Sequence, residues 1–262
     1  MRRTLSNSMK IRIPPTKDIW TAASFLALVV ILVFSCMWVW EQYLKTPPYV
    51  DPERYPIRGI DISAHNGDIN FRDVRRDGIE FAFIKASEGT DFKDKKFADN
   101  YLKARKAGIK TGAYHFFRFD KDGVDQAINF LRATGNRKLD LGLAIDIEQQ
   151  GNPEGIDKEL ITQRLTAMAE YLFLLGYRVT FYTNRTGYEE FLMDSFPGYP
   201  LWICSFSEHP IDADWTYWQY DHHGKVKGIH GDVDLDTFNG SRSDWRKYLA
   251  QWPNRNKIIR FG

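Results

Sequence analysis

The chain has 262 residues and a formal net charge of +2, with 43% hydrophobic and 15% aromatic residues. A charge this close to neutral gives no reason to expect a nucleic-acid partner. The apolar content excludes a disordered chain and is enough for one large domain with a full core. Cys36 lies in an apolar N-terminal run and Cys204 in the body of the chain, so the folded domain should contain no internal disulfide.

The first expected element is an apolar helix near the N-terminus. No charged residue occurs between Asp18 and Glu41. A helix of this length, rising about 1.5 Å per residue, can cross a hydrocarbon core of about 30 Å. Tryptophans stand at both ends of the run, as in the interfacial belts of membrane helices. The pattern predicts a transmembrane anchor over residues 19–40.

The flanks of this segment predict its orientation. Five basic residues precede it against one acid, Asp18, so the positive-inside rule makes residues 1–18 a cytoplasmic leader. The large domain would then lie outside the cytoplasm, in the periplasm or at the cell exterior, on a single-pass membrane protein. Residues 41–57 contain four prolines and are expected to form an extended linker. A cleaved signal peptide is the alternative, but the charged leader is long and no small-x-small cleavage site follows the apolar run.

Residues 58–250 alternate β-like runs with helical patterns, and a short basic tail follows at 251–262. Strands are expected at Arg58–Ser63, Phe81–Ser87, Lys110–Phe116, Leu141–Ile147, Arg178–Thr183, Leu201–Ser205, Tyr217–Tyr220 and Asp232–Leu235. Helices are expected at Phe71–Asp77, Asp94–Ala107, Asp122–Thr134, Lys158–Leu175 and Thr186–Met193, with Gly108 and Gly176 as left-handed caps. Strand and helix in alternation imply a parallel sheet, and eight strands imply an α/β barrel.

This barrel should be an irregular (β/α)8 type, because the gaps between the last three strands are too short for full helices. An open doubly wound sheet is the alternative fold. It is disfavoured because no glycine-rich phosphate loop follows the first strand.

The run Leu143–Glu148 carries the strongest functional signal. Asp146 and Glu148 are two residues apart at the end of an apolar strand, so their side chains point to the same side. Burying two neighbouring carboxyl groups costs free energy, because like charges resist joint ionisation. Cleavage of a glycosidic bond needs this arrangement: one carboxyl kept protonated as an acid, and an anion beside the developing positive charge.

Polar and aromatic side chains also gather at the other strand ends, where a barrel of this type carries its site. Carboxylates, rings and amides together are what a carbohydrate site requires. His115, within a strand, is expected to pack rather than to act as a base. The triplet Asp232, Asp234 and Asp236 could indicate calcium, but its spacing fits an exposed turn equally well, so no metal and no other cofactor is predicted.

Seven motifs occur in the order found in a known family. They are Gly59-Ile60-Asp61-Ile62-Ser63, Phe81 to Gly89, Gly112-Ala113-Tyr114-His115-Phe116-Phe117, Ile145-Asp146-Ile147-Glu148, Pro200-Leu201-Trp202-Ile203, Trp218-Gln219-Tyr220 and Val233 to Phe238. Over residues 58–239 the sequence resembles glycoside hydrolase family 25, the Chalaropsis-type lysozymes or N-acetylmuramidases. One departure is Asp236, where the family usually has Asn.

The resemblance implies a retaining hydrolase of the β-1,4 bond between N-acetylmuramic acid and N-acetylglucosamine in peptidoglycan. Glu148 matches the general acid, and Asp146 matches the carboxylate that supports the N-acetyl group or acts as nucleophile. Asp61 and Asp234 match two further active-site aspartates. The residues that match the lining of the family's cleft are Tyr114, Phe116, Tyr182, Trp202 and Gln219. The expected partners are peptidoglycan glycan strands and, through the anchor, a membrane; the protein is expected to be a monomer.

Two other functions are weighed against this one. Substrate-assisted chitinases carry a third acid two residues before the Asp-x-Glu pair, where this chain has Ala144. A non-catalytic glycan-binding module would be favoured by loss of Asp146 or Glu148, and both are present.

Overall fold

The computed structural model describes residues 16–39, 48–206 and 210–251. The chain divides into two compact units, residues 1–46 and 47–262. Much of the expected leader, the start of the linker and the tail from residue 252 lie outside the described residues. The first unit contains α1 (Thr16–Val39). In the described part of the chain, no helix is both long and apolar enough to cross a membrane. This corrects the prediction of a transmembrane anchor at 19–40, and the single-pass topology is not supported.

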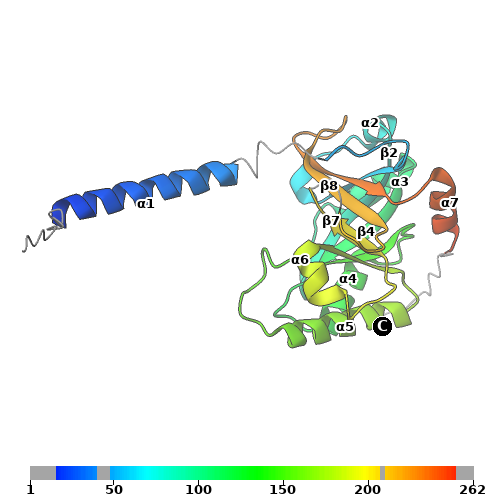
Figure 1. Ribbon diagram of the computed structural model, residues 1–262. Helices are drawn as coiled ribbons and strands as arrows, with labels where there is room; N and C mark the ends of the chain where they lie inside the picture. Colours follow the sequence, from blue (N-terminus) through cyan, green and yellow to red (C-terminus); the bar gives the residue numbers. More distant parts are fainter. Residues whose placement is uncertain (1–15, 40–47, 207–209, 252–262) are drawn as a thin grey trace, which may run out of the picture. The chain divides into compact units, whose positions relative to one another are not determined.

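The second unit is a closed barrel of eight strands with helices around it (Figure 1). The strands are β1 (Arg58–Ile62), β2 (Ile79–Glu88), β4 (Lys110–Phe116), β5 (Gly142–Asp146), β6 (Val179–Asn184), β7 (Leu201–Cys204), β8 (Tyr217–Gly224) and β9 (Val233–Phe238). Their order is β1-β9-β8-β7-β6-β5-β4-β2, and pairing of β1 with β2 closes the sheet. The short β3 (Phe92–Lys93) extends β2 outside the barrel. Closure confirms the predicted barrel and excludes the open sheet.

One strand runs against the others. β9 is antiparallel to both β8 and β1, whereas the other barrel strands pair in parallel. Parallel neighbours need a crossover of about a dozen residues or more, and residues 225–232 are too few to provide one. The expectation of a parallel sheet is therefore wrong for the last strand. As a result, the beginning of β9 lies at the same mouth as the carboxyl ends of the other seven strands.

The helices are α2 (Phe71–Arg76), α3 (Phe97–Lys106), α4 (Gly123–Thr134), α5 (Lys158–Leu174), α6 (Arg185–Gly187) and α7 (Arg242–Gln251). A 3-10 turn at Ala64–Asn66 follows β1, and a π-helical turn at Tyr188–Leu192 follows α6. Asp122 and Asp157 cap α4 and α5 by accepting backbone N–H bonds. Gly108 and Gly176 follow α3 and α5 with φ of +83° and +85°, as predicted for left-handed caps.

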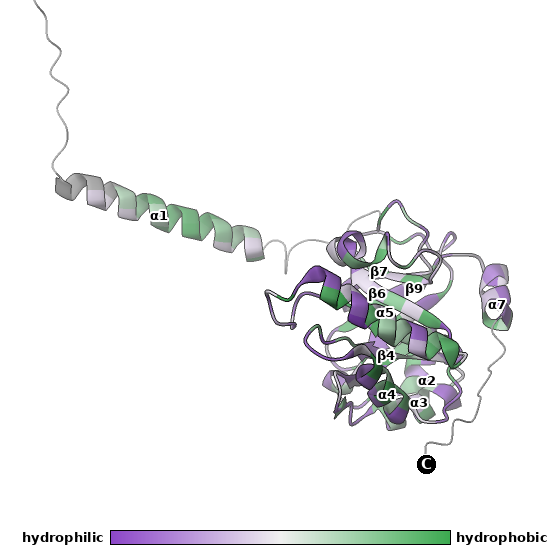
Figure 2. Cartoon of the chain, turned by 90° about the horizontal axis from the view of Figure 1, so that it is seen from below, coloured by the Kyte–Doolittle hydropathy of each residue, from purple (hydrophilic) through white to green (hydrophobic). Residues whose placement is uncertain are grey.

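The core has two parts, separated by the wall of the barrel. Alternate strand residues such as Leu143 and Ile145 pack outward against the helices. The opposite set, including Phe81, Phe83 and Trp202, fills the interior. Figure 2 shows the same division in the helices: α4 and α5 carry both hydrophobic and hydrophilic residues, as helices with one packed face should.

Candidate active site

The mouth of the barrel opens into a cleft of about 640 Å³. Eight of the nine residues predicted for the site line it: Asp61, Tyr114, Asp146, Glu148, Tyr182, Trp202, Gln219 and Asp234. The other lining residues were not predicted for the site; they are Gln150, Asn184, Arg185, Thr186, Cys204, Ser205 and Phe206. The fold thus brings together side chains from seven of the eight barrel strands and from the loops after them.

Strand alternation on β5 aims Asp146 into the barrel. Ala144 belongs to the interior cluster and Ile145 to the outer one, so Asp146 points inward at the end of the strand. Its side chain is 7% exposed, and its Oδ1 atom has no hydrogen-bond partner among the described residues. An unpaired carboxylate oxygen at this depth is costly, which favours a role in chemistry over a role in stability.

Glu148 follows the end of β5 and is held through its main chain. Asn152 donates from Nδ2 to the carbonyl oxygens of Glu148 at 2.8 Å and Phe117 at 3.0 Å. The Asn152 Oδ1 atom accepts the Phe119 N–H at 2.8 Å. This asparagine therefore ties the loop carrying Glu148 to the loop after β4. No pattern in the sequence marks it, because the contact joins two loops.

The electrostatics of Asp146 and Glu148 favour the protonated forms. Burial raises the pKa of both carboxyl groups, and the neighbouring Glu148 raises that of Asp146 further. Two contacts act against this: a hydrogen bond with Tyr182 lowers the pKa of Glu148, and the Lys85 ammonium lowers the pKa of both groups. Two carboxyls that share a buried space resist joint ionisation, so one of them keeps its proton to a higher pH than an exposed carboxyl group does.

Two further carboxyl groups stand across the mouth. Asp61 and Asp234 are direct cross-strand partners on β1 and β9. Burial, then Asp234 and Asp236, raise the pKa of Asp61. Burial, followed by Glu148 and Asp221, raises the pKa of Asp234 to about 7. Because β9 is antiparallel, Asp234 reaches the mouth from the beginning of its strand.

Asp236 lies one step deeper than Asp234 on the same face of β9. It is fully buried and accepts a 2.8 Å hydrogen bond from Nε1 of Trp202. Its other oxygen has no partner among the described residues, and burial raises its pKa well above the ordinary range. This departure from the family pattern therefore places a fifth carboxyl group beneath the cleft.

Aromatic rings form the floor of the cleft. Trp202 is 1% exposed, stacks on Phe83 at 4.5 Å between ring centroids, and packs against Tyr182 at the same distance. The hydroxyl of Tyr182 donates to Oε1 of Gln219 at 2.8 Å, and Nε2 of Gln219 donates to Oδ2 of Asp61 at 2.7 Å. Rings and amides are thus interlocked with the carboxyl groups.

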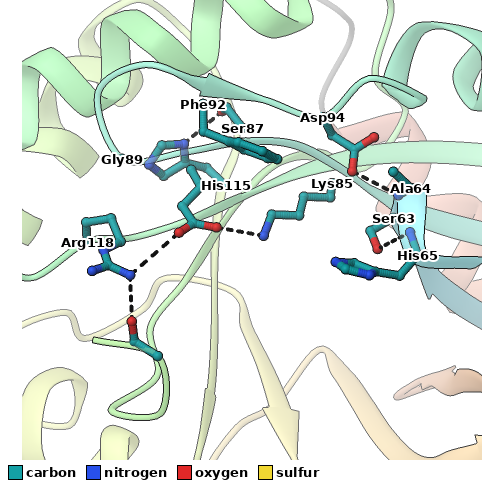
Figure 3. A network of polar contacts seen from close by, with 12 residues as sticks. Ser63, Ala64, His65, Lys85, Ser87, Gly89, Phe92, Asp94, His115 and Arg118 are labelled. Atoms are coloured by element: carbon teal, nitrogen blue, oxygen red, sulfur yellow. Dashed lines mark hydrogen bonds and ion pairs between the residues drawn. The ribbon is translucent and has the colours of Figure 1, made fainter. Parts of the chain in front are cut away.

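Phe116 is the predicted site residue that does not line the cleft. Its half-buried ring lies under Lys85, whose Nζ is 5.2 Å from the ring centroid. Lys85 also forms a 2.9 Å ion pair with Glu88, which lies 3.6 Å from Arg118 (Figure 3). Lys85 is on the same inward face of β2 as Phe81 and Phe83. A buried strand rarely carries a cation without a partner, so the sequence already indicated a buried acid near this lysine.

His115 packs on the helix side of β4, where its ring centroid lies 5.3 Å from that of Phe130 on α4, and it does not line the cleft. Figure 3 shows it beside Ser87. Its Nδ1 lies 2.8 Å from Oγ of Ser87 and its Nε2 lies 3.2 Å from Oε1 of Gln126. Gln126 uses its amide nitrogen to donate to two carbonyls, so its oxygen accepts and the proton sits on Nε2. Burial lowers the pKa of His115 to about 3, which suits the packed, neutral histidine expected from the sequence.

Asp232, which precedes β9, and Asp234 and Asp236, which lie within it, have different surroundings. Asp232 is at the rim, where its carboxylate pairs with Lys225 and with Nδ1 of His223 at 2.9 Å. Asp236 is enclosed in the interior. Within the ranges that the structure describes, no three His, Cys, Asp or Glu side chains are grouped to hold a metal ion.

The sequence is similar to that of a known family of glycosyl hydrolases and to two lysozymes. Residues 60–229 match the model of the glycosyl hydrolases family 25. The autolytic lysozyme of Clostridium acetobutylicum is 35% identical over 185 residues, which are 70% of this chain and 56% of that protein. Lysozyme M1 of Streptomyces globisporus is 36% identical over 204 residues, 71% of this chain and 68% of that enzyme.

Solved structures give the same result. A family 25 glycosyl hydrolase from Bacillus anthracis superposes with a TM-score of 0.69 at 33% identity, covering 78% of this chain and 97% of that one. A bacterial lysozyme from Streptomyces coelicolor gives 0.66 at 32% identity, covering 77% and 98%. The chain spans little more than half of the clostridial relative, whereas it covers nearly all of these two structures.

Proposed function

The chain belongs to glycosyl hydrolase family 25, and we propose that it is a lysozyme acting on peptidoglycan. Its substrate would be the β-1,4 bond between N-acetylmuramic acid and N-acetylglucosamine. The observation that carries the proposal is the cluster of Asp61, Asp146, Glu148 and Asp234 at one barrel mouth. Two relatives with the name lysozyme, each more than a third identical to this chain, support the substrate.

In the proposed mechanism, Glu148 protonates the glycosidic oxygen. Burial raises its pKa, so it retains a proton in the range where an exposed glutamate has lost it. Asp146 supports the oxocarbenium-like state, either through the N-acetyl group or directly as nucleophile. Water then completes hydrolysis with Glu148 as base, and the anomeric configuration is retained.

The rest of the cleft suits a sugar chain. Tyr114, Tyr182 and Trp202 offer apolar faces, and Gln219 and Asn184 offer amides for hydroxyl and N-acetyl groups. One chain supplies all of these side chains, which supports the proposal that the protein acts as a monomer. Because peptidoglycan lies outside the cytoplasmic membrane, this substrate requires the barrel, at residues 58–250, to act outside the cytoplasm.

The products of digestion test the proposal. Defined peptidoglycan should yield fragments that end in reducing muramic acid, identified by mass spectrometry. Reducing glucosamine ends would indicate a glucosaminidase, and release from chitin alone would indicate a chitinase. Binding to purified sacculi without turnover would contradict catalysis altogether.

A further inference from the structure

The cleft does not extend equally to both sides of Asp146 and Glu148. More than half of its lining residues lie on β6, on β7 or directly after these strands. On the other side, β4 contributes Tyr114, and β2 contributes none of the described lining residues. A hydrolase that cuts within a glycan strand must hold sugars on both sides of the bond. Part of the strand would therefore have to rest on the side of the mouth that β4, β2 and β3 form.

A row of paired residues leads across the sheet from Asp146 to this side. Phe116 on β4 is the register partner of Asp146. Glu88 on β2 pairs with Phe116 on one side and with Phe92 of β3 on the other. Strands are about 4.8 Å apart, so Phe92 lies three spacings, or about 14 Å along the sheet, from Asp146. A pyranose unit is comparable in length to one strand spacing, so Phe92 is at the distance of the third sugar from the bond.

An irregularity in β2 brings Glu88 to the same side of the sheet as Lys85. Residues three apart in a regular strand point to opposite faces. The register of β2 against β4 shifts between Lys85 and Ser87, and a bulge of this kind re-aims the side chains that follow it. Lys85 and Glu88 can thus form their 2.9 Å ion pair. The ring of Phe92 lies beside this pair, with its centroid 5.6 Å from Nζ of Lys85 (Figure 3). We call Lys85, Glu88 and Phe92 the outer shelf.

The hairpin that carries the outer shelf is fixed from behind by one buried amide. Asn129, on α4, is 3% exposed. Its Nδ2 donates to the carbonyl oxygens of Gly89 at 3.0 Å and Phe92 at 3.1 Å, and lies 3.3 Å from that of Glu88. The side chain of Phe92, by contrast, is 50% exposed. Because the backbone is already held, the ring can pack on a ligand without the entropy cost of ordering a loop.

We propose that the outer shelf binds the glycan strand on the β2 side of the scissile bond, with the ring of Phe92 packed on the third sugar. This rests on the proposed action on peptidoglycan. The ring offers an apolar face, and the ammonium and carboxylate groups beside it can bond to hydroxyl and N-acetyl groups. The ion pair of Lys85 and Glu88 has no net charge, which suits an uncharged sugar better than a charged stem peptide.

The test compares peptidoglycan oligosaccharides of two lengths, both free of stem peptides. A tetrasaccharide cut at its centre has two sugars on each side of the bond and ends before the outer shelf, whereas an octasaccharide reaches it. Phe92→Ala should lower the ratio of kcat/KM for the octasaccharide to kcat/KM for the tetrasaccharide by about fivefold, the effect of one lost aromatic contact. Phe92→Tyr keeps the ring and should keep the wild-type ratio.

The control and the contrary results are equally defined. Phe173→Ala removes a ring of similar exposure, 54%, from α5 and should not change the ratio. An unchanged ratio in Phe92→Ala overturns the proposal, even if both rates fall equally, because a ring that only supports the fold does not distinguish the two lengths. If the ratio falls only for an octasaccharide that carries stem peptides, the outer shelf binds peptide and the assignment to sugar is wrong.

A binding measurement separates failure of the outer shelf from failure of the proposed function. The Kd of the octasaccharide for Glu148→Gln, measured by calorimetry, requires no cleavage. Adding Phe92→Ala to this variant should raise the Kd about fivefold. That result would support the outer shelf even if the wild type released no muramic-acid ends. An unchanged Kd, or no binding to either protein, would overturn it even in an active lysozyme.

Discussion

The two ends of the barrel interior contain different kinds of side chain: aromatic rings at the base and carboxyl groups at the mouth. At the base, Phe81, Phe238 and Trp245 pack ring against ring, with centroid distances of 4.9 to 5.5 Å from Trp245. At the mouth, carboxyl groups of Asp61 and Asp146 are just as buried but cost free energy. The comparison indicates that packing at the base stabilises the fold, whereas the buried carboxyl groups at the mouth lower its stability and serve the chemistry.

The packing of the base is close enough to dictate a glycine. A Cβ on Gly59 would lie 2.2 Å from the ring of Phe81, so only glycine fits opposite this ring. Two residues further along β1, Asp61 reaches the mouth. The motif Gly59-Ile60-Asp61 therefore reaches from the base to the mouth. Gly59 packs against Phe81, Ile60 faces the helices and Asp61 faces the cleft.

The strongest way to test this division is to remove the acid at the mouth. Glu148→Gln should lower kcat/KM for muropeptide release by about 10²- to 10⁴-fold, the contribution typical of general acid catalysis. Its melting temperature should not fall, because a neutral amide removes a buried titratable group. Glu154→Gln changes an exposed glutamate on the same loop and should leave activity unchanged. Retained activity in Glu148→Gln would move the acid to another carboxyl group.

The second prediction concerns the base. Phe81→Ala should destabilise the barrel by about 3 to 5 kcal/mol, because it empties space around a fully buried ring. Denaturant unfolding measures the loss, and the kcat of the folded fraction at low temperature should change little. The matched control is Phe173→Ala, at a ring that is 54% exposed on α5, which should cost far less. A large loss of kcat in folded Phe81→Ala would show that base and mouth are not separable.

The sequence predicts much of this structure because its signals are local. Apolar runs such as Leu143–Ile145 indicate a buried strand, and Gly108 and Gly176 mark where helices end. The carboxyl ends of parallel strands meet at one mouth, so Asp61 and Glu148 could be placed near each other without a structure. Their catalytic roles stay predictions until the variants are measured.

What the sequence did not predict depends on contacts between distant segments. The direction of β9 is an exception: it follows from a connection too short for a crossover, and the length of that connection can be read in the sequence. Phe116 is on the inward face of β4, but Lys85 covers its ring, so strand register alone does not make a residue part of the cleft. The membrane span expected at 19–40 is also not supported, because no helix among the described residues is both long and apolar enough to cross a membrane.

The smallest expected effect concerns Asp236, where mouth and base meet. Its raised pKa means that the folded protein keeps a proton which the unfolded chain releases above the ordinary value of 3.8. Stability should therefore fall as pH rises above about 4. Asp236→Asn keeps an oxygen to accept from Trp202 but does not titrate. The variant and the wild type should thus be similar at pH 4, and the variant should be the more stable of the two at pH 8.

Thermal unfolding across this pH range measures the difference, with Asp244→Asn as control. Asp244 is exposed on α7, and its hydrogen bonds to Ser241 lower its pKa, so its replacement should act weakly and with the opposite sign. A pH-independent difference between Asp236→Asn and the wild type would mean that Asp236 titrates normally. The free-energy cost of the mouth would then be carried by Asp61, Asp146, Glu148 and Asp234, the carboxyl groups that line the cleft.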